Sequence, residues 1–401
     1  MSDKNSFFRK GKFLLSFGFL AVFMGNFGQS FFIGSYGASI QQALELSASG
    51  YGLVYSVATL IAGTSIMFVG GYIDRIPLRH FVLYVAAGLF IGSLIMFASV
   101  NVWILGCGLV AIRLCGQGLL PHTGITTMAR CFDSDRGKAI SIAASGVPAG
   151  EILLPIMAAV LIAQLGWQQS WLVVAALVPL GFIPVGLWLL KNAEKSGFEF
   201  APVASIGGSP SHSSVGRSEV LLDGRFWRVL PAVIAGPFVV TGVFIHQSFY
   251  MQQKLWSMEL FASSFIAYGV VHWISSLAAG VMVDRYSAVR LLAYYNLPLA
   301  AAMLVVGFVD GPLVPFLMLG LLGMSIGFGG PVAGALWAEA YGTGKIGSIR
   351  SMTTSFGVWA TSLSPIILGV LIDADVSISL LSLCMALAVF AACVSAAFSY
   401  K

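Results

Sequence analysis

Residues 70–75 read Gly-Gly-Tyr-Ile-Asp-Arg, and residues 280–285 read Gly-Val-Met-Val-Asp-Arg. The pattern G-x-x-x-D-R therefore occurs twice, 210 positions apart in a chain of 401 residues. The same offset relates four further places: Gly137 and Gly347, Pro121 and Pro331, Pro155 and Pro365, and the tripeptides Val160-Leu161-Ile162 and Val370-Leu371-Ile372. Because one register is kept at five places, the sequence predicts two copies of one structural unit.

The composition is that of a membrane protein. Hydrophobic residues make up 58% of the chain and charged residues 9%, and the mean hydropathy is +0.91, whereas soluble domains carry about 25% charged residues. A helix needs about 20 apolar residues to cross the bilayer core. The charge-poor stretches predict spans at 13–36, 50–72, 81–99, 102–127, 139–163, 169–190, 229–250, 260–283, 289–309, 312–337, 347–372 and 377–398. We therefore predict an all-α membrane protein of twelve helices in two pseudo-symmetric halves.

The halves are predicted at 1–190 and 226–401, joined by a cytoplasmic linker at 191–225. The middle of the linker, Ala204 to Gly216, is rich in Ser, Gly and Pro, so it is expected to act as a flexible tether. Its end, Ser218 to Leu230, mixes charged and apolar residues. This segment has two alternative structures: a helix along the membrane surface and an irregular lead into the seventh span.

The basic residues lie on one side of the predicted membrane. All but two of the 21 Lys and Arg fall at the termini, in the central linker or in the loops on the same side, the exceptions being Lys254 and Arg113. Positively charged short loops stay in the cytoplasm, so both termini are expected there. The protein itself is expected in the inner membrane of a bacterium. This topology explains the net charge of +5, and we expect no nucleic-acid partner.

A duplicated half in a strongly apolar chain is typical of secondary transporters, whose substrate site lies between the repeats. No nucleotide-binding loop is present, so the energy is expected to come from an ion gradient. The five cysteines lack C-x-x-C spacing, and we expect neither a metal site nor a cofactor. The protein is expected to be no enzyme and to function as a monomer in the lipid bilayer.

The G-x-x-x-D-R pattern after the second predicted span, followed by further basic residues, resembles the signature of the major facilitator superfamily. The resemblance implies a conformational latch on the cytoplasmic side that favours the outward-facing form. We transfer this role to the matching residues of the two copies: Gly70, Asp74, Arg75, Arg79, Asp284 and Arg285. The alternative is that these charges only set the topology.

The stretch from Arg130 to Ala139 resembles the F-x-x-x-R-G-x-A segment of the monocarboxylate and oxalate/formate porter branch, and His246 also suits that branch. The cations that bind anions in helices 8 and 11 of that branch are missing, because helix 8 has His272 and helix 11 has only Ser, Thr and Trp359. A dianion such as oxalate is therefore disfavoured, and a small organic monoanion is favoured.

Two charged residues lie near the middle of predicted spans, Arg113 in the fourth and Glu151 in the fifth. Each costs about 2.5–3.5 kcal/mol at mid-membrane unless it is paired or faces water. They are expected to be partners or cavity residues, and a static structural ion pair is the alternative. Glu151 is the mid-membrane carboxylate able to carry a proton.

Polar side chains recur at helical spacing on several spans, and such stripes normally line a bundle or a cavity. With Arg113 and Glu151 they make up the predicted substrate and proton pathway: Asn26, Gln29, Ser30, Tyr36, Gln117, His246, Tyr250, Tyr268, His272 and Trp359. A lone histidine on such a stripe is more often a hydrogen-bonding partner of a neighbouring helix than a proton carrier.

The favoured function is proton-coupled uptake of a small organic monoanion by alternating access. The runner-up is export of an amphiphilic compound by proton antiport, because Gly146-Val-Pro-Ala-Gly150 resembles an antiporter signature without its Gly-Pro pair. A remote alternative is an intramembrane serine hydrolase using Ser325 and His272, since residues 323–327 fit G-x-S-x-G. That motif needs a strand-turn-helix context, which an apolar helical run does not offer.

Overall fold

The computed structural model describes the chain except for residues 1, 133–134, 201–216, 343–345 and 400–401. The described residues form helices, turns and loops and contain no strand, which confirms the all-α prediction. The expected tether, Ala204 to Gly216, lies outside the described residues.

The helices that correspond to the six predicted spans of the first half are interrupted at several places. In chain order they are α1 (Ser2–Gly25), η1 (Asn26–Gly28), α2 (Ser30–Ser35), α3 (Gly37–Ala43), α4 (Ala48–Val69), η2 (Gly70–Asp74), α5 (Leu78–Phe97), α6 (Val102–Ile112), η3 (Arg113–Leu119), α7 (Leu120–Cys131), α8 (Arg136–Ala144), α9 (Gly146–Leu165), α10 (Trp167–Leu177), η4 (Val178–Phe182) and α11 (Ile183–Lys195). Both η3 and η4 are π-helical turns, whereas η1 and η2 are 3-10 turns.

The second half contains longer helices. They are α12 (Arg217–Leu222), α13 (Gly224–Ile245), α14 (Gln247–Lys254), α15 (Met258–Tyr286), α16 (Ala288–Leu291), α17 (Leu297–Phe308), α18 (Val314–Tyr341), α19 (Ile346–Asp373) and α20 (Ile378–Ala397). Eleven helical stretches of the described chain are long and apolar enough to cross a membrane. The ninth predicted span is met by α16, a turn and the shorter apolar helix α17, which brings the number of spans to twelve.

The chain divides into two compact units. Unit 1 comprises Met1–Leu44 and Val57–Gly207, and unit 2 comprises Glu45–Ser56 and Gly208–Lys401. One continuous helix, α4, therefore begins in unit 2 and continues in unit 1. No pattern in the sequence indicated this division of α4.

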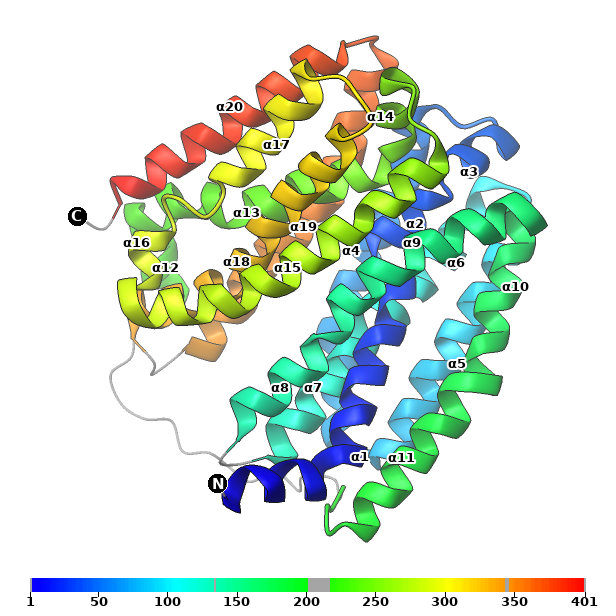
Figure 1. Ribbon diagram of the computed structural model, residues 1–401, viewed down its shortest axis with the longest axis vertical. Helices are drawn as coiled ribbons and strands as arrows, with labels where there is room; N and C mark the ends of the chain where they lie inside the picture. The colour runs from blue at the N-terminus through cyan, green and yellow to red at the C-terminus, as the bar shows by residue number, and fades with distance from the viewer. Residues whose placement is uncertain (1, 133–134, 201–216, 343–345, 400–401) are drawn as a thin grey trace. The chain divides into compact units, whose positions relative to one another are not determined.

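The same packing scheme occurs in both units. In unit 1, α1 contacts α7, α8, α9 and α11, while α5 packs between α6 and α10 (Figure 1). In unit 2, α13 contacts α18, α19 and α20, while α17 packs on α18 and α20. Since helices related by the 210-residue offset have corresponding neighbours, the repetition in the sequence is also a repetition of helix packing.

The segment before the seventh span is helical. The Asp223 side chain accepts a hydrogen bond from the Arg225 backbone N–H at 2.8 Å and so caps α13, as acidic residues do at helix starts. Val220 of α12 and Phe226 of α13 are fully buried in the core of unit 2, where Phe226 contacts Trp337 with ring centroids 5.5 Å apart. The irregular lead-in that the sequence left open is therefore replaced by a short helix packed on this core.

Candidate functional site

Arg113 lies where the regular α-helix of the fourth span changes to a π-helical turn. The helix α6 ends at Ile112, and Arg113 begins η3. Its side chain is 3% exposed, and Nη1 donates a hydrogen bond to the Gly28 carbonyl oxygen at 3.3 Å. A Cβ added to Gly28 would lie 2.3 Å from the Ile112 carbonyl oxygen. Only glycine permits this approach of η1 to the start of η3, and π turns are frequent at functional sites.

Asn26 connects this region to the fifth span. Its Nδ2 donates to the Phe23 carbonyl at 3.0 Å and to the Gly146 carbonyl at 2.9 Å. Glu151, the second predicted mid-membrane charge, is 3% exposed and follows Gly146 by little more than one turn of α9. Because η1 contacts both η3 and α9, Asn26 lies on an element that packs against the element of Arg113 and against the element of Glu151.

The remaining predicted residues of unit 1 surround these elements. Gln29, Ser30 and Gln117 are partly buried. Tyr36 is fully buried against the rings of Phe32 and Trp171, with centroids 5.3 and 5.1 Å apart. Tyr36 therefore contributes at least to packing.

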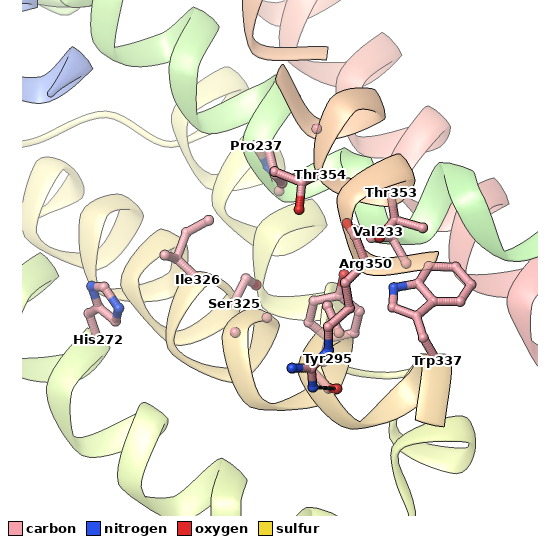
Figure 2. A pocket seen from close by; sticks show the side chains of 16 residues that line it. Val233, Pro237, His272, Tyr295, Ser325, Ile326, Trp337, Arg350, Thr353 and Thr354 are labelled. Carbon is pink, nitrogen blue, oxygen red and sulfur yellow. Dashed lines mark hydrogen bonds between the residues drawn. The ribbon is translucent and has the colours of Figure 1, made fainter. Parts of the chain in front are cut away.

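Unit 2 contains a cavity of about 610 Å³ whose walls come mainly from α13, α15, α18 and α19. Its polar lining side chains are His272, Tyr295, Ser325, Arg350, Thr353 and Thr354. In Figure 2, His272 lies at one side of the drawn side chains and Trp337 at the other, with Arg350 between them. The Ser325 side chain is 1% exposed, and its Oγ has no hydrogen-bond partner among the described protein atoms.

The prediction that the eleventh span contains no cation was wrong. Arg350 was counted as a loop charge, but it lies in α19, and its guanidinium donates a hydrogen bond to the Gly334 carbonyl oxygen at the cavity wall. The signal was available, because the predicted span 347–372 already contained this residue. Ser325 was also missed as a cavity residue, because only its place in an apolar run was considered.

Of the five pathway residues predicted in unit 2, His272 is among the side chains that line this cavity. His246 is buried where α13 gives way to α14, and its Nε2 donates to the Pro365 carbonyl oxygen at 2.7 Å. Tyr250 is fully buried, and Tyr268 packs its ring on Phe244 at 5.2 Å. Trp359 is 51% exposed.

The first G-x-x-x-D-R copy is held by charges of its own unit. Asp74 forms an ion pair with Arg130 at the end of α7, and Arg130 Nη1 also donates to the Ile73 carbonyl oxygen at 3.3 Å. Arg79 forms an ion pair with Glu194 of α11. Gly70 is buried in η2, and the Arg75 guanidinium lies 5.7 Å from the centre of the Tyr72 ring.

The second copy uses a different contact at the corresponding place. Asp284 and Arg285 are exposed at the end of α15, with Arg285 over the Tyr286 ring at 5.2 Å. Glu339 of α18 accepts hydrogen bonds from the backbone N–H groups of Ala288 and Val289 at 2.9 and 3.3 Å. In the first repeat the Arg130 guanidinium contacts the loop from α7, whereas in the second repeat the Glu339 carboxylate does so from α18.

The G-x-S-x-G string does not form a nucleophile elbow. Ser325 lies inside the continuous helix α18, where no strand leads into a turn before it. The geometry that exposes a catalytic serine at such an elbow is absent from this described helix.

The family model described as Major Facilitator Superfamily matches residues 18–365. Among solved structures, the chain is similar to a bacterial homolog of the human lysosomal transporter Spinster, in an inward-facing and unoccupied conformation, with a TM-score of 0.66 and 15% sequence identity over 97% of this chain and 92% of the other. A search of curated proteins found no match. At this identity the structural likeness concerns the fold alone.

Proposed function

Because the chain belongs to the Major Facilitator Superfamily, we propose that this transporter works by alternating access and imports a small organic monoanion together with a proton. The proposal places both termini in the cytoplasm and the protein, as a monomer, in a bacterial inner membrane. The orientation of the termini follows the distribution of basic residues along the chain.

The observation that carries the proposal is the burial of two ionisable side chains inside unit 1. Arg113 and Glu151 are each 3% exposed on adjacent spans. An ionisable group at membrane depth is expensive, and such residues commonly mark substrate or proton pathways. The Gly28 carbonyl fixes one guanidinium nitrogen of Arg113, and a guanidinium offers further donors suited to a carboxylate.

In this mechanism Arg113 binds the carboxylate of the substrate, and Glu151 takes up and releases the coupled proton. A proton on Glu151 leaves Arg113 with an excess positive charge, which favours binding of an anion. Loss of that proton on the inner side restores the negative charge of Glu151 and weakens anion binding. Proton and substrate binding are therefore linked.

The cavity of unit 2 supports the same substrate class. Its volume of about 610 Å³ is in the usual range for small-molecule sites, about 300–1,000 Å³. Arg350 supplies a second cation, and the unpartnered Ser325 Oγ supplies a hydrogen-bonding group. We assign this cavity to the substrate pathway.

One observation favours the alternative, which is export of an amphiphilic compound by proton antiport. The cavity wall also includes Val233, Pro237, Ile326 and Trp337 and several glycines, so an apolar body could bind beside Arg350. The two functions predict opposite proton movements when substrate enters.

The test compares Glu151→Gln, Arg113→Gln and the double variant in proteoliposomes. Glu151→Gln should abolish accumulation driven by a pH gradient while leaving counterflow measurable, because the amide mimics only the protonated acid. Arg113→Gln should lose both activities. Glu259→Gln, which changes an exposed glutamate at the start of α15, should retain both.

Concentrative uptake by Glu151→Gln would contradict the coupling role. Recovery of thermal stability in the double variant, after a loss in each single variant, would instead assign the two residues to a structural ion pair, since removing one partner strands a buried charge.

A further inference from the structure

The amino-terminal end of α4 is held by a carboxylate that is distant in sequence. The backbone N–H of Ala48 donates to Asp373 Oδ1 at 3.0 Å, and that of Ser49 donates to Oδ2 at 2.9 Å. Ser47 Oγ accepts from the Gly50 N–H at 3.1 Å. The first N–H groups of a helix have no partner inside the helix, so the last residue of α19 completes the cap of α4.

Below this cap the two helices touch backbone to backbone. A Cβ added to Gly52 would lie 2.3 Å from the Pro365 carbonyl oxygen, and one added to Gly369 would lie 2.6 Å from the Ala48 carbonyl oxygen. Two glycines, one on each helix, therefore permit the approach that brings Asp373 to the N–H groups of α4. The contact between α4 and α19 therefore depends on two glycines for its close approach and on the Asp373 carboxylate for its charge.

The contact is also placed where α4 changes unit. Residues Glu45–Ser56 belong to unit 2, and Val57 begins the part of α4 that belongs to unit 1. The Asp373 side chain is exposed, so water can reach the carboxylate and the helix end when they separate. Exposed charge-assisted contacts are weak enough to form and break during a conformational cycle.

We propose that Asp373 is a releasable cap that keeps the first turns of α4 on α19 while the outer side of the transporter is closed. The inference rests on the alternating-access function proposed above and on the topology that puts both helix ends on the outer side. Opening toward the outside would detach the start of α4 from α19 and transfer its N–H groups from the carboxylate to water. The cap thereby sets the fraction of transporter molecules whose outer side is closed.

The test measures this population directly. Spin labels on Glu45→Cys and Ala374→Cys, in a background without the five native cysteines, report the separation of the two helix ends by pulsed electron resonance. Asp373→Asn weakens the cap and Asp373→Ala removes it, and loss of an N-cap should raise the ratio of separated to closed ends by about 3- to 10-fold. Asp310→Asn, which changes an exposed carboxylate paired with Lys254, should leave the ratio unchanged.

A second pair of variants tests the packing below the cap. Gly52→Ala should separate the helix ends in the same direction, because its Cβ has no room beside Pro365. Gly320→Ala adds the same methyl group to α18, where the nearest atom is 3.9 Å away, and should change nothing.

The proposal is overturned if folded Asp373→Ala and Gly52→Ala both keep the distance distribution of the parent protein. This readout needs neither a substrate nor a proton gradient. Failure of the cap is therefore distinguishable from failure of the proposed transport function.

Discussion

Asn26 bridges two spans because its neighbour on the second span has no side chain. A Cβ on Gly150 would lie 2.1 Å from Asn26 Nδ2 and 2.4 Å from its Cγ. The amide therefore occupies the space that a side chain at position 150 would need. The space at Gly150 and the hydrogen bond from Asn26 to the Gly146 carbonyl both bring η1 close to α9.

Gly150→Ala should destabilise the protein by about 1–3 kcal/mol, as overpacking of a tight core typically does. The measurement is the thermal unfolding midpoint in detergent. The same substitution should cost less in an Asn26→Ala background, where most of the colliding atoms are gone. Equal losses in the two backgrounds would contradict this explanation, and Gly71→Ala, which meets nothing within 4 Å, is the matched control.

The site residues that could be predicted from the sequence are those whose side chain differs in polarity from the neighbouring residues of the chain. A charged residue in an apolar run is visible without a structure, so Arg113 and Glu151 were identified, and both are buried in unit 1. Arg350 was misassigned because a charge near a helix end resembles a loop charge. The environment of Ser325 depends on how α18 packs, and packing cannot be read from a single sequence.

The loop between the second and third spans is an element fixed by charges from two other helices. Arg130 of α7 binds Asp74, and Glu194 of α11 binds Arg79. The side chains of the first pair are 33% and 49% exposed, so the pair contributes about 0–1 kcal/mol to stability. The role proposed for this pair is to set the balance between conformations.

Asp74→Asn should therefore leave the unfolding midpoint nearly unchanged and shift the population toward inward-facing conformers. Distances between labels at the amino-terminal ends of α5 and α16, which the proposed orientation places in the cytoplasm, report that shift. An unchanged distance distribution would remove the latch from the account. Asp135→Asn, which changes a carboxylate paired with Lys138 at 2.5 Å, serves as the control.

The positions of the spans were predictable because hydropathy determines where a chain can cross a bilayer. Their internal breaks were not. The 3-10 turn at Asn26–Gly28, the π turn at Arg113–Leu119 and the turn between α16 and α17 depend on which backbone groups find partners on neighbouring helices. Composition fixes the length of a span and leaves its local hydrogen-bond register open.

At the scale of the whole molecule, the 210-residue repeat in the sequence corresponds to a repeat of helix packing in the two units. The two units share the main helix contacts and differ in their helix breaks and in their buried chemistry. Unit 1 buries Arg113 and Glu151 inside its spans, whereas unit 2 presents Arg350 and His272 in a cavity. This difference suits a transporter in which one unit carries the proton-coupling residues and both contribute to the substrate pathway.

The central claim is that entry of an organic monoanion brings a proton with it. The most direct test records the internal pH of proteoliposomes loaded with a pH-sensitive dye while short monocarboxylates are added outside, with Glu151→Gln vesicles as the reference for passive permeation of the acids. The account predicts that at least one monoanion acidifies the lumen faster with the parent protein than with Glu151→Gln. Alkalinisation of the lumen on addition of substrate, or equal rates in the two preparations for every monoanion, would contradict it.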